Sequence, residues 1–263
     1  TKVKKLIILD SNEFALYKIE KKLYSYLNKD KLNIKLISIL ADIKNEDSLE
    51  RVFNRFDIDI IYHAAAYKHV PIVEENVIEG VNNNILGTLK LCEIAFKKNI
   101  KNFTLISTDK AVRPTNVMGA TKRVAEMIVQ AYAEKSAKYK NSKFSIVRFG
   151  NVLDSTGSVI PLFREQIENG GPITLTHKDV TRYFMTISEA SQLVIESSLI
   201  SKGGEIFILK MGDPINIIDL ARRMIELSGL KERSISNPSG DIEIETIGLR
   251  PGEKIFEELL IDD

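Results

Sequence analysis

Five short runs rich in Ile, Leu and Val recur along the first 151 residues, and stretches with helical periodicity separate them. The runs are VKKLIILD (3–10), NIKLISILAD (33–42), IDIIYHAAA (58–66), KNFTLIST (101–108) and KFSIVRFGN (143–151). Continuous apolar strands that alternate with amphipathic helices are typical of a parallel sheet with helices on both faces. The sequence therefore predicts a doubly wound α/β fold.

The helices and the lobes can be placed from the same pattern. Helices are expected over 13–28, 47–56, 74–99, 117–138 and 187–200. The last begins with a capping-box pattern, Thr186 followed three residues later by Glu189. After residue 151, Gly and Pro punctuate shorter elements in STGSVIP, ENGGPITL and KMGDP, which indicates a second lobe. We expect one domain over 1–150 and a smaller lobe over 151–263, with 183–208 returning to the first domain.

Composition excludes several classes of partner. The chain has 37 Lys and Arg against 36 Asp and Glu, a net charge of +1, so no basic field favours nucleic acid or an anionic membrane. Its single cysteine, Cys92, allows no internal disulfide and suits a reducing cytoplasm. The three histidines are dispersed, so no metal site is expected. The apolar runs are shorter than the roughly 18 residues of a membrane helix. A small molecule is the expected partner.

Residues at the ends of the first three strands suit a dinucleotide. Asp10, with Ser11 beside it, ends the first strand, where an acidic side chain can hold the adenosine ribose and repel a 2′-phosphate; NAD is therefore preferred to NADP. Asp42 and Ile43 follow the second strand, near the expected adenine edge. Ala64, Ala65 and Ala66 let the backbone approach the cofactor closely. Taken alone, Asp10 could be a helix cap and the alanines tight packing. Together they predict an NAD-binding domain over 1–150.

One part of a dinucleotide site does not occur in the sequence. No G-x-x-G-x-x-G turn is present to cradle a pyrophosphate. In dinucleotide-binding folds an acidic residue follows the Gly-rich turn by about twenty residues, at the end of the next strand, and Asp10 occupies that place. We therefore expect that the chain lacks the first strand, the Gly-rich turn and the first helix of this fold, and that it begins like the middle of a domain.

Polar residues gather after the fourth strand and on the following helix. Thr108, Asp109 and Lys110 close the strand, and Met118 and Lys122 are spaced i, i+4, so that they share one helix face. A hydroxyl, a carboxyl and two amines would converge at the crevice end of the sheet, which is enough for acid–base chemistry. The alternative is a cap, a surface ion pair and a packing methionine.

The chain resembles the extended short-chain dehydrogenase/reductase superfamily and, within it, the nucleotide-sugar 4,6-dehydratases of polysaccharide biosynthesis. HAAAYKHVP, STDKAVRPTNVMGATKR, RFGNVLDSTGSVIP and LRPGEK carry the resemblance. The form of this motif that has methionine at position 118 (the Met form) is similar to that of UDP-N-acetylglucosamine 4,6-dehydratases that retain the C5 configuration, as in bacterial protein glycosylation. The inverting relatives generally have Tyr at the position of Met118.

The resemblance implies a mechanism. NAD takes the C4 hydride, Lys110 is the base at C5, Asp109 protonates the departing C6 hydroxyl, and the hydride returns to C6. A thioether has no proton to give, so Met118 cannot act as the usual Tyr does. We expect water or Asp109 to accept the C4 hydroxyl proton, assisted by Thr108 and Lys122, with Tyr67 as an outside candidate.

The resemblance also implies a substrate side formed mainly by the second lobe. Its expected contacts to UDP-N-acetylglucosamine are Lys68, His69, Lys110, Asn151, Thr176, His177, Arg250 and Glu253. Arg250 is expected on the diphosphate, because the guanidinium fork matches two oxygens at once. The alternative reading of the LRPGEK segment is a solvated charged turn.

Two other functions stay open from the sequence. One is a C5-inverting dehydratase or a nucleotide-sugar epimerase on the same scaffold; the other is a silent module that binds NAD and a UDP-sugar. We expect a homo-oligomer and a cytoplasmic catalytic domain, with a membrane-anchoring region preceding it, as the resemblance implies for the Met form.

Overall fold

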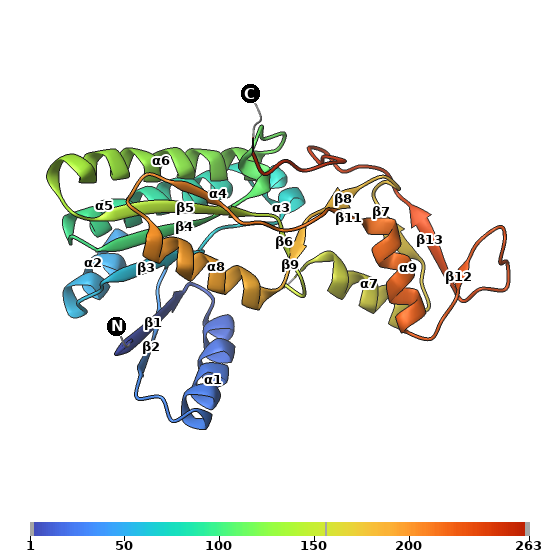
Figure 1. The fold of residues 1–263 in the computed structure, drawn as a ribbon, viewed down its shortest axis with the longest axis horizontal. Coiled ribbons are helices and arrows are strands. Elements are labelled where there is room, and N and C mark those ends of the chain that lie inside the picture. The colour runs from blue at the N-terminus through green and yellow to red at the C-terminus, as the bar shows by residue number, and fades with distance from the viewer. Residues whose placement is uncertain (1–2, 156, 261–263) are drawn as a thin grey trace.

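The computed structural model describes residues 3–155 and 157–260 of the chain and shows an α/β fold (Figure 1). The strands of the first half are all parallel: β1 (Lys5–Asp10), β2 (Lys35–Leu40), β3 (Ile60–His63), β4 (Asn102–Thr108) and β5 (Lys143–Phe149). Strands β3, β4 and β5 share a sheet with β10 (Ile206–Ile208) in the order β10-β5-β4-β3. Strands β1 and β2 form a separate pair among the described residues. The predicted parallel strands are confirmed.

Asparagine side chains fix where the main helices start. Asn12, Asn45 and Asn116 each accept a hydrogen bond from the backbone N–H three residues on, which satisfies a donor at the helix terminus. They cap α1 (Glu13–Lys29), α2 (Glu46–Arg55) and α6 (Val117–Tyr139). The capping box predicted at Thr186 and Glu189 opens α8 (Ile187–Ile200) and is confirmed.

The prediction of one continuous helix over 74–99 is wrong. The segment contains α3 (Val70–Glu75), α4 (Val77–Gly80), a π-helical stretch over Val81–Gly87 and α5 (Thr88–Lys97). Asn76 interrupts the helix with φ −131° and ψ 54°. The π stretch lets the side chain of Asn84 turn inward, where it bonds both the N–H and the C=O of Tyr67. Apolar periodicity does not register such a change of pitch.

Two faces of the four-stranded sheet are covered, as a doubly wound fold requires. Phe103, Leu105, Phe144 and Ile146 of β4 and β5 share a core with apolar residues of α5 and α6. Val147, which points to the other face, packs with residues of α8. Figure 1 shows α6 and α5 along one side of these strands and α8 along the other. The carboxyl ends of β3, β4 and β5 therefore meet at one edge, beside the second lobe.

The second lobe has its own core. Phe163, Ile173, Ile217, Ile225 and Ile242 are buried together there. They come from α7 (Val159–Glu168), β7 (Ile173–Leu175), α9 (Ile217–Leu227) and β13 (Ile242–Thr246), with β12 (Glu232–Arg233) beside β13. Short pairs join this lobe to the first: β6 (Asn151–Val152) with β9 (Phe184–Met185), and β8 (Thr181–Arg182) with β11 (Ile215–Asn216). Within 183–208, α8 packs on the first sheet and β10 pairs with β5. Among the described residues, none of the helices combines the length and the apolar composition that a membrane crossing requires.

A buried ion pair ties α6 to the ends of β4 and β5. The carboxylate of Glu126 accepts bonds of 2.7 and 2.6 Å from Nε and Nη2 of Arg148, and one of 2.6 Å from Ser107. Burial raises the pKa of Glu126, but the hydrogen bonds from Arg148 and Ser107 outweigh it and hold this pKa below its ordinary value.

Replacing Glu126 with Ala is expected to lower the free energy of unfolding by about 3–5 kcal/mol, because Arg148 stays buried without a counter-charge. Arg123→Ala is the matched control: this half-exposed side chain donates to the same carboxylate, and its loss should cost less than about 1 kcal/mol. Urea denaturation measures both. Equal losses would show that the buried charge is not what stabilises this contact.

Candidate active site

A cavity of about 460 Å³ lies at the carboxyl ends of β3, β4 and β5, next to the second lobe. Its size is within the range of about 300–1,000 Å³ that small-molecule sites occupy. The cavity brings together most of the residues predicted from sequence: Ala64, Ala66, Lys68, His69, Thr108, Lys110, Met118, Lys122, Asn151, Arg250 and Glu253. It also takes in Arg182 and Glu257, which sequence reasoning missed.

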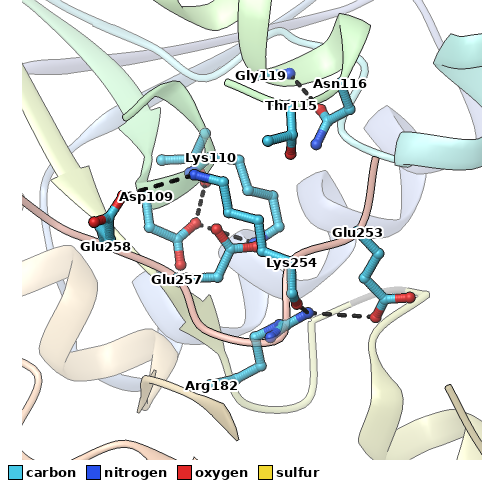
Figure 2. Close-up of polar contacts among 12 residues, drawn as sticks. Asp109, Lys110, Thr115, Asn116, Gly119, Arg182, Glu253, Lys254, Glu257 and Glu258 are labelled. Carbon is cyan, nitrogen blue, oxygen red and sulfur yellow. Dashed lines mark hydrogen bonds and ion pairs between the residues drawn. The ribbon is translucent and has the colours of Figure 1, made fainter. Parts of the chain in front are cut away.

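A 3₁₀ turn over Asp109–Ala111 directs the side chains that follow β4. Oδ1 of Asp109 accepts a 2.8 Å bond from the hydroxyl of Thr108 and a 3.0 Å bond from Nζ of Lys110. Asp109 is fully buried, and Nζ of Lys110 lies 3.4 Å from Oε1 of Glu257. Figure 2 shows these carboxyls around Lys110, with the last segment of the chain passing beside the turn. The lysine is thus held between two buried acids.

The start of α6 packs directly on this turn. A Cβ placed on Gly119 would overlap the carbonyl oxygen of Lys110, so the contact requires glycine. The N-cap residue Asn116 accepts a 2.7 Å bond from the N–H of Gly119 and also donates 3.1 Å to the carbonyl of Gly252. This close approach places Met118 and Lys122 in the wall of the same cavity as Lys110.

Lys122 is a buried amine whose charge is poorly compensated. Its Nζ donates a 2.6 Å bond to the carbonyl of Ile106, at the end of β4. Burial lowers the pKa of Lys122 from 10.5 to about 8, although the negative charge of Glu126 raises it in part. An amine with this pKa exchanges protons near neutral pH.

The loop after β3 is held from behind by buried polar groups. Asn84 bonds both backbone groups of Tyr67 and donates 3.0 Å to Thr121 of α6. His63 bonds Thr88 at 2.8 Å, and burial together with the charge of Lys122 lowers the pKa of His63 to about 3. His63 therefore stays neutral at physiological pH. These contacts fix the alanine loop and position Lys68 and His69 at the cavity.

The LRPGEK segment and the residues after it return from the second lobe to the site. Glu253 accepts bonds from Thr176 (3.0 Å), from Nη2 of Arg182 (3.3 Å) and from the N–H of Arg250 (3.2 Å). The buried guanidinium of Arg182 also donates to the carbonyls of Lys254 and Ile255. Figure 2 shows Arg182 reaching Glu253 across this segment. A buried Arg with these partners fastens the segment over the cavity.

Eight predicted site residues lie outside the cavity wall: Asp10, Ser11, Asp42, Ile43, Ala65, Asp109, Thr176 and His177. The cap of α1 is Asn12, and Asp10 accepts its N–H at 2.7 Å, so Asp10 is not the helix cap considered from sequence. Asp42 bonds the N–H of Lys44 at 2.8 Å, while Ile43 is buried and packs against Gly87. Their assignment to the cofactor, and that of His177 to the substrate, stays a prediction.

Comparison with known proteins identifies the family. Residues 1–263 match the family described as "Polysaccharide biosynthesis protein". The chain is 50% identical over 257 residues to the capsular polysaccharide biosynthesis protein CapD of Staphylococcus aureus, covering 97% of this chain and 41% of CapD. It is 32% identical over 225 residues to a UDP-N-acetylglucosamine 4,6-dehydratase (inverting) of Campylobacter jejuni, covering 85% and 62% respectively. The chain belongs to this polysaccharide-biosynthesis family and spans about two-fifths of the length of CapD.

Solved structures show the same fold. Pen from Bacillus thuringiensis superposes with a TM-score of 0.85 at 36% identity, covering 98% of this chain and 74% of that one. DesIV (dTDP-glucose 4,6-dehydratase) from Streptomyces venezuelae, with NAD and TYD bound, superposes with a TM-score of 0.81 at 18% identity, covering 98% and 80%. The predicted Rossmann-like fold of the extended short-chain dehydrogenase/reductase superfamily is confirmed.

The lowered pKa of Lys122 predicts a pH-dependent stability. Between pH 8 and 10.5 the unfolded chain binds more protons at this amine than the folded chain, so its contribution to stability rises with pH there and is lost as pH falls through about 8. The free energy of unfolding of the wild type should therefore rise relative to that of Lys122→Met from about pH 7 to 9.5, by at most about 1.4 kcal/mol per pH unit. Urea titrations across this range measure the difference, and a difference independent of pH would contradict the assignment.

Proposed function

We propose that this chain carries the active site of an NAD-dependent 4,6-dehydratase that acts on UDP-N-acetylglucosamine and retains the C5 configuration. The observation that carries the proposal is the convergence of Lys110 and Lys122 on one cavity at the carboxyl edge of a parallel sheet, with the buried carboxyls of Asp109 and Glu257 beside the amine of Lys110. Ligands of open α/β folds bind at this edge. The names of the Campylobacter relative and of the DesIV structure support the reaction class.

The residues present fit the two ends of a dinucleotide. Small side chains after β3 and the amine of Lys122 border the cavity, where a nicotinamide would lie, and the exposed carboxylate of Asp10 ends β1, where an adenosine ribose would bind. The DesIV structure, which has the same fold, contains bound NAD. When bound, NAD supplies reversible hydride transfer, which removes hydrogen from C4 of the sugar and returns it at C6. Asp42 and Ile43 complete the proposed adenosine end.

Lys110 is proposed as the base that removes the C5 proton. It lies on the cavity wall, and Asp109 and Glu257 fix its amine from two sides. Met118 is buried in the wall of the same cavity and has no proton to transfer, so it serves as an apolar wall for the sugar. Water or Asp109 is left to accept the C4 hydroxyl proton, with Thr108 and Lys122 assisting.

Arg250 is proposed to bind the diphosphate. Its side chain lines the cavity, and no hydrogen bond or ion pair engages its guanidinium among the described residues. Glu253, in contrast, is occupied by Arg182, Thr176 and the backbone of residue 250, so it shapes the loop that carries Arg250. Asn151, Lys68 and His69 border the same cavity and are proposed to contact the sugar nucleotide.

A second candidate is an inverting dehydratase, because the Campylobacter relative is named as one. The two candidates differ only in the face on which C5 regains its proton. A silent binding module is less well supported, because Lys110 borders the cavity and its amine pairs with the buried carboxylate of Asp109, an arrangement that binding alone does not require. A homo-oligomer and a preceding membrane anchor remain predictions from the resemblance.

Replacing Asp109 with Asn should abolish formation of the 4-keto-6-deoxy sugar by the full-length protein, because the neutral amide can take up no proton from the sugar and carries no charge to pair with Lys110. UDP binding, followed by calorimetry, should change little, since Asp109 is not part of the cavity wall among the described residues. Near-normal turnover by Asp109→Asn would contradict the assignment.

Replacing Arg250 with Ala should raise KM for the UDP-sugar by at least about tenfold, as expected for a lost charged contact of about 1.5–3 kcal/mol. Arg222→Ala is the matched control, because this half-exposed arginine pairs with Asp219 and Glu232 on the second lobe and does not border the cavity. Steady-state kinetics measure both variants. An unchanged KM for Arg250→Ala would remove this residue from the site.

A further inference from the structure

One carboxyl oxygen of Asp109 is left without a partner beside the cavity. Its Oδ1 accepts bonds from the hydroxyl of Thr108 and from Nζ of Lys110, which hold the carboxyl in one orientation. Its Oδ2 is buried and has no hydrogen-bond partner among the described residues. Buried polar atoms are rarely left unpaired, so Oδ2 is the atom through which Asp109 would exchange a proton with a ligand.

Gly150 lies next to this oxygen and borders the cavity. It directly follows β5, and within the part of the chain that the structure describes it belongs to the cavity wall, whereas Asp109 does not. A Cβ placed on Gly150 would lie 3.0 Å from Oδ2 of Asp109. The same Cβ would lie 3.1 Å from Cβ of Tyr183 and 3.2 Å from Sδ of Met211. The absence of a side chain at position 150 therefore leaves room for the free oxygen just behind the wall.

Asp109 is the neighbour that would have to move if position 150 had a side chain. Its Oδ2 would be the atom closest to the added carbon. Tyr183 is fixed, because its Cβ is attached directly to the backbone and its carbonyl accepts a 2.9 Å bond from the N–H of Asn151. Gly150 lies outside the left-handed region, so the backbone accepts alanine and the effect is steric. The carboxyl of Asp109 would turn away and weaken its contact with Lys110.

We propose that the missing side chain of Gly150 positions the carboxyl of Asp109, so that Asp109 delivers a proton to the C6 oxygen of the sugar as it departs. This role rests on the dehydratase function proposed above. Lys110 takes the C5 proton, and the electron pair of that C–H bond forms the C5–C6 double bond. The C6–O bond breaks, and the proton on Oδ2 of Asp109 joins the departing oxygen, which leaves as water. The proton released from the C4 hydroxyl restores Asp109, so the protons balance. Gly150 is a positioning residue, because it acts only through Asp109.

Replacing Gly150 with Ala tests this role in the full-length protein. The variant should lower kcat on UDP-N-acetylglucosamine by about 10- to 100-fold, as expected when a catalytic group is displaced by up to about 1 Å. KM should stay close to that of the wild type. The added methyl group meets Asp109, Tyr183 and Met211, none of which borders the cavity within the described ranges. Steady-state kinetics measure both constants.

A change of leaving group separates this role from a general loss of structure. Fluoride departs without a proton, so a UDP-N-acetylglucosamine with fluorine in place of the C6 hydroxyl does not need proton delivery by Asp109. On this fluoro substrate, Gly150→Ala should keep a kcat close to that of the wild type.

Met211→Leu is the matched control. This buried side chain packs on the same glycine, and its Sδ accepts a 2.8 Å bond from the N–H of Gly150. Leucine removes that acceptor at nearly constant volume and leaves the room for Asp109 unchanged. Its kcat on both substrates should therefore stay near that of the wild type.

Four results would overturn the role of Gly150. The first is an unchanged kcat for Gly150→Ala on the natural substrate, with or without a raised KM. The second is an equal loss on the two substrates, because a structural defect does not depend on the leaving group. The third is a loss for Met211→Leu as large as that for Gly150→Ala. A wild-type protein that converts neither substrate would instead contradict the dehydratase function itself, and the role of Gly150 with it.

Discussion

The arrangement of the site depends on the close packing of the first turn of α6 against the 3₁₀ turn that follows β4. Only glycine at 119 lets the helix approach the carbonyl of Lys110, and Asn116 both caps the helix and holds Gly252. This one contact brings Lys110, Met118 and Lys122 into the wall of the same cavity. It also gives the last segment of the chain a surface to dock on, where Thr115 and Asn116 both donate to the carbonyl of Gly252.

The second lobe completes the site through buried charge. Arg182 distributes its donors over Glu253 and the carbonyls of Thr181, Lys254 and Ile255, which offsets the cost of burying a guanidinium. Lys254 donates 2.9 Å to the carbonyl of Val112 and so fastens the same segment to the first domain. The two cores thus meet across a segment that brings the carboxyl of Glu257 to 3.4 Å from the amine of Lys110.

Local pattern in the sequence was enough to place the strands β1 to β5, the helices α1, α2, α6 and α8, and the i, i+4 pair of Met118 and Lys122. It failed at 74–99, because the apolar periodicity continues through the π stretch while the inward turn of Asn84 depends on Tyr67, far away in sequence. Arg182 and Glu257 were missed for a related reason. Their burial results from contacts between distant segments, and on their own they read as ordinary charged residues of a turn. An acidic residue amid the apolar residues of EKIFEELL was the signal available for Glu257.

The most direct test of the proposed reaction is to incubate the full-length protein with UDP-N-acetylglucosamine in D₂O and to follow the sugar by proton NMR. The expected product is a 4-keto-6-deoxy sugar that has its original C5 configuration and deuterium at C5, because Lys110 exchanges the C5 proton with solvent. Unchanged substrate, with UDP-sugar binding still detectable, would contradict the account and leave a binding module without dehydratase activity.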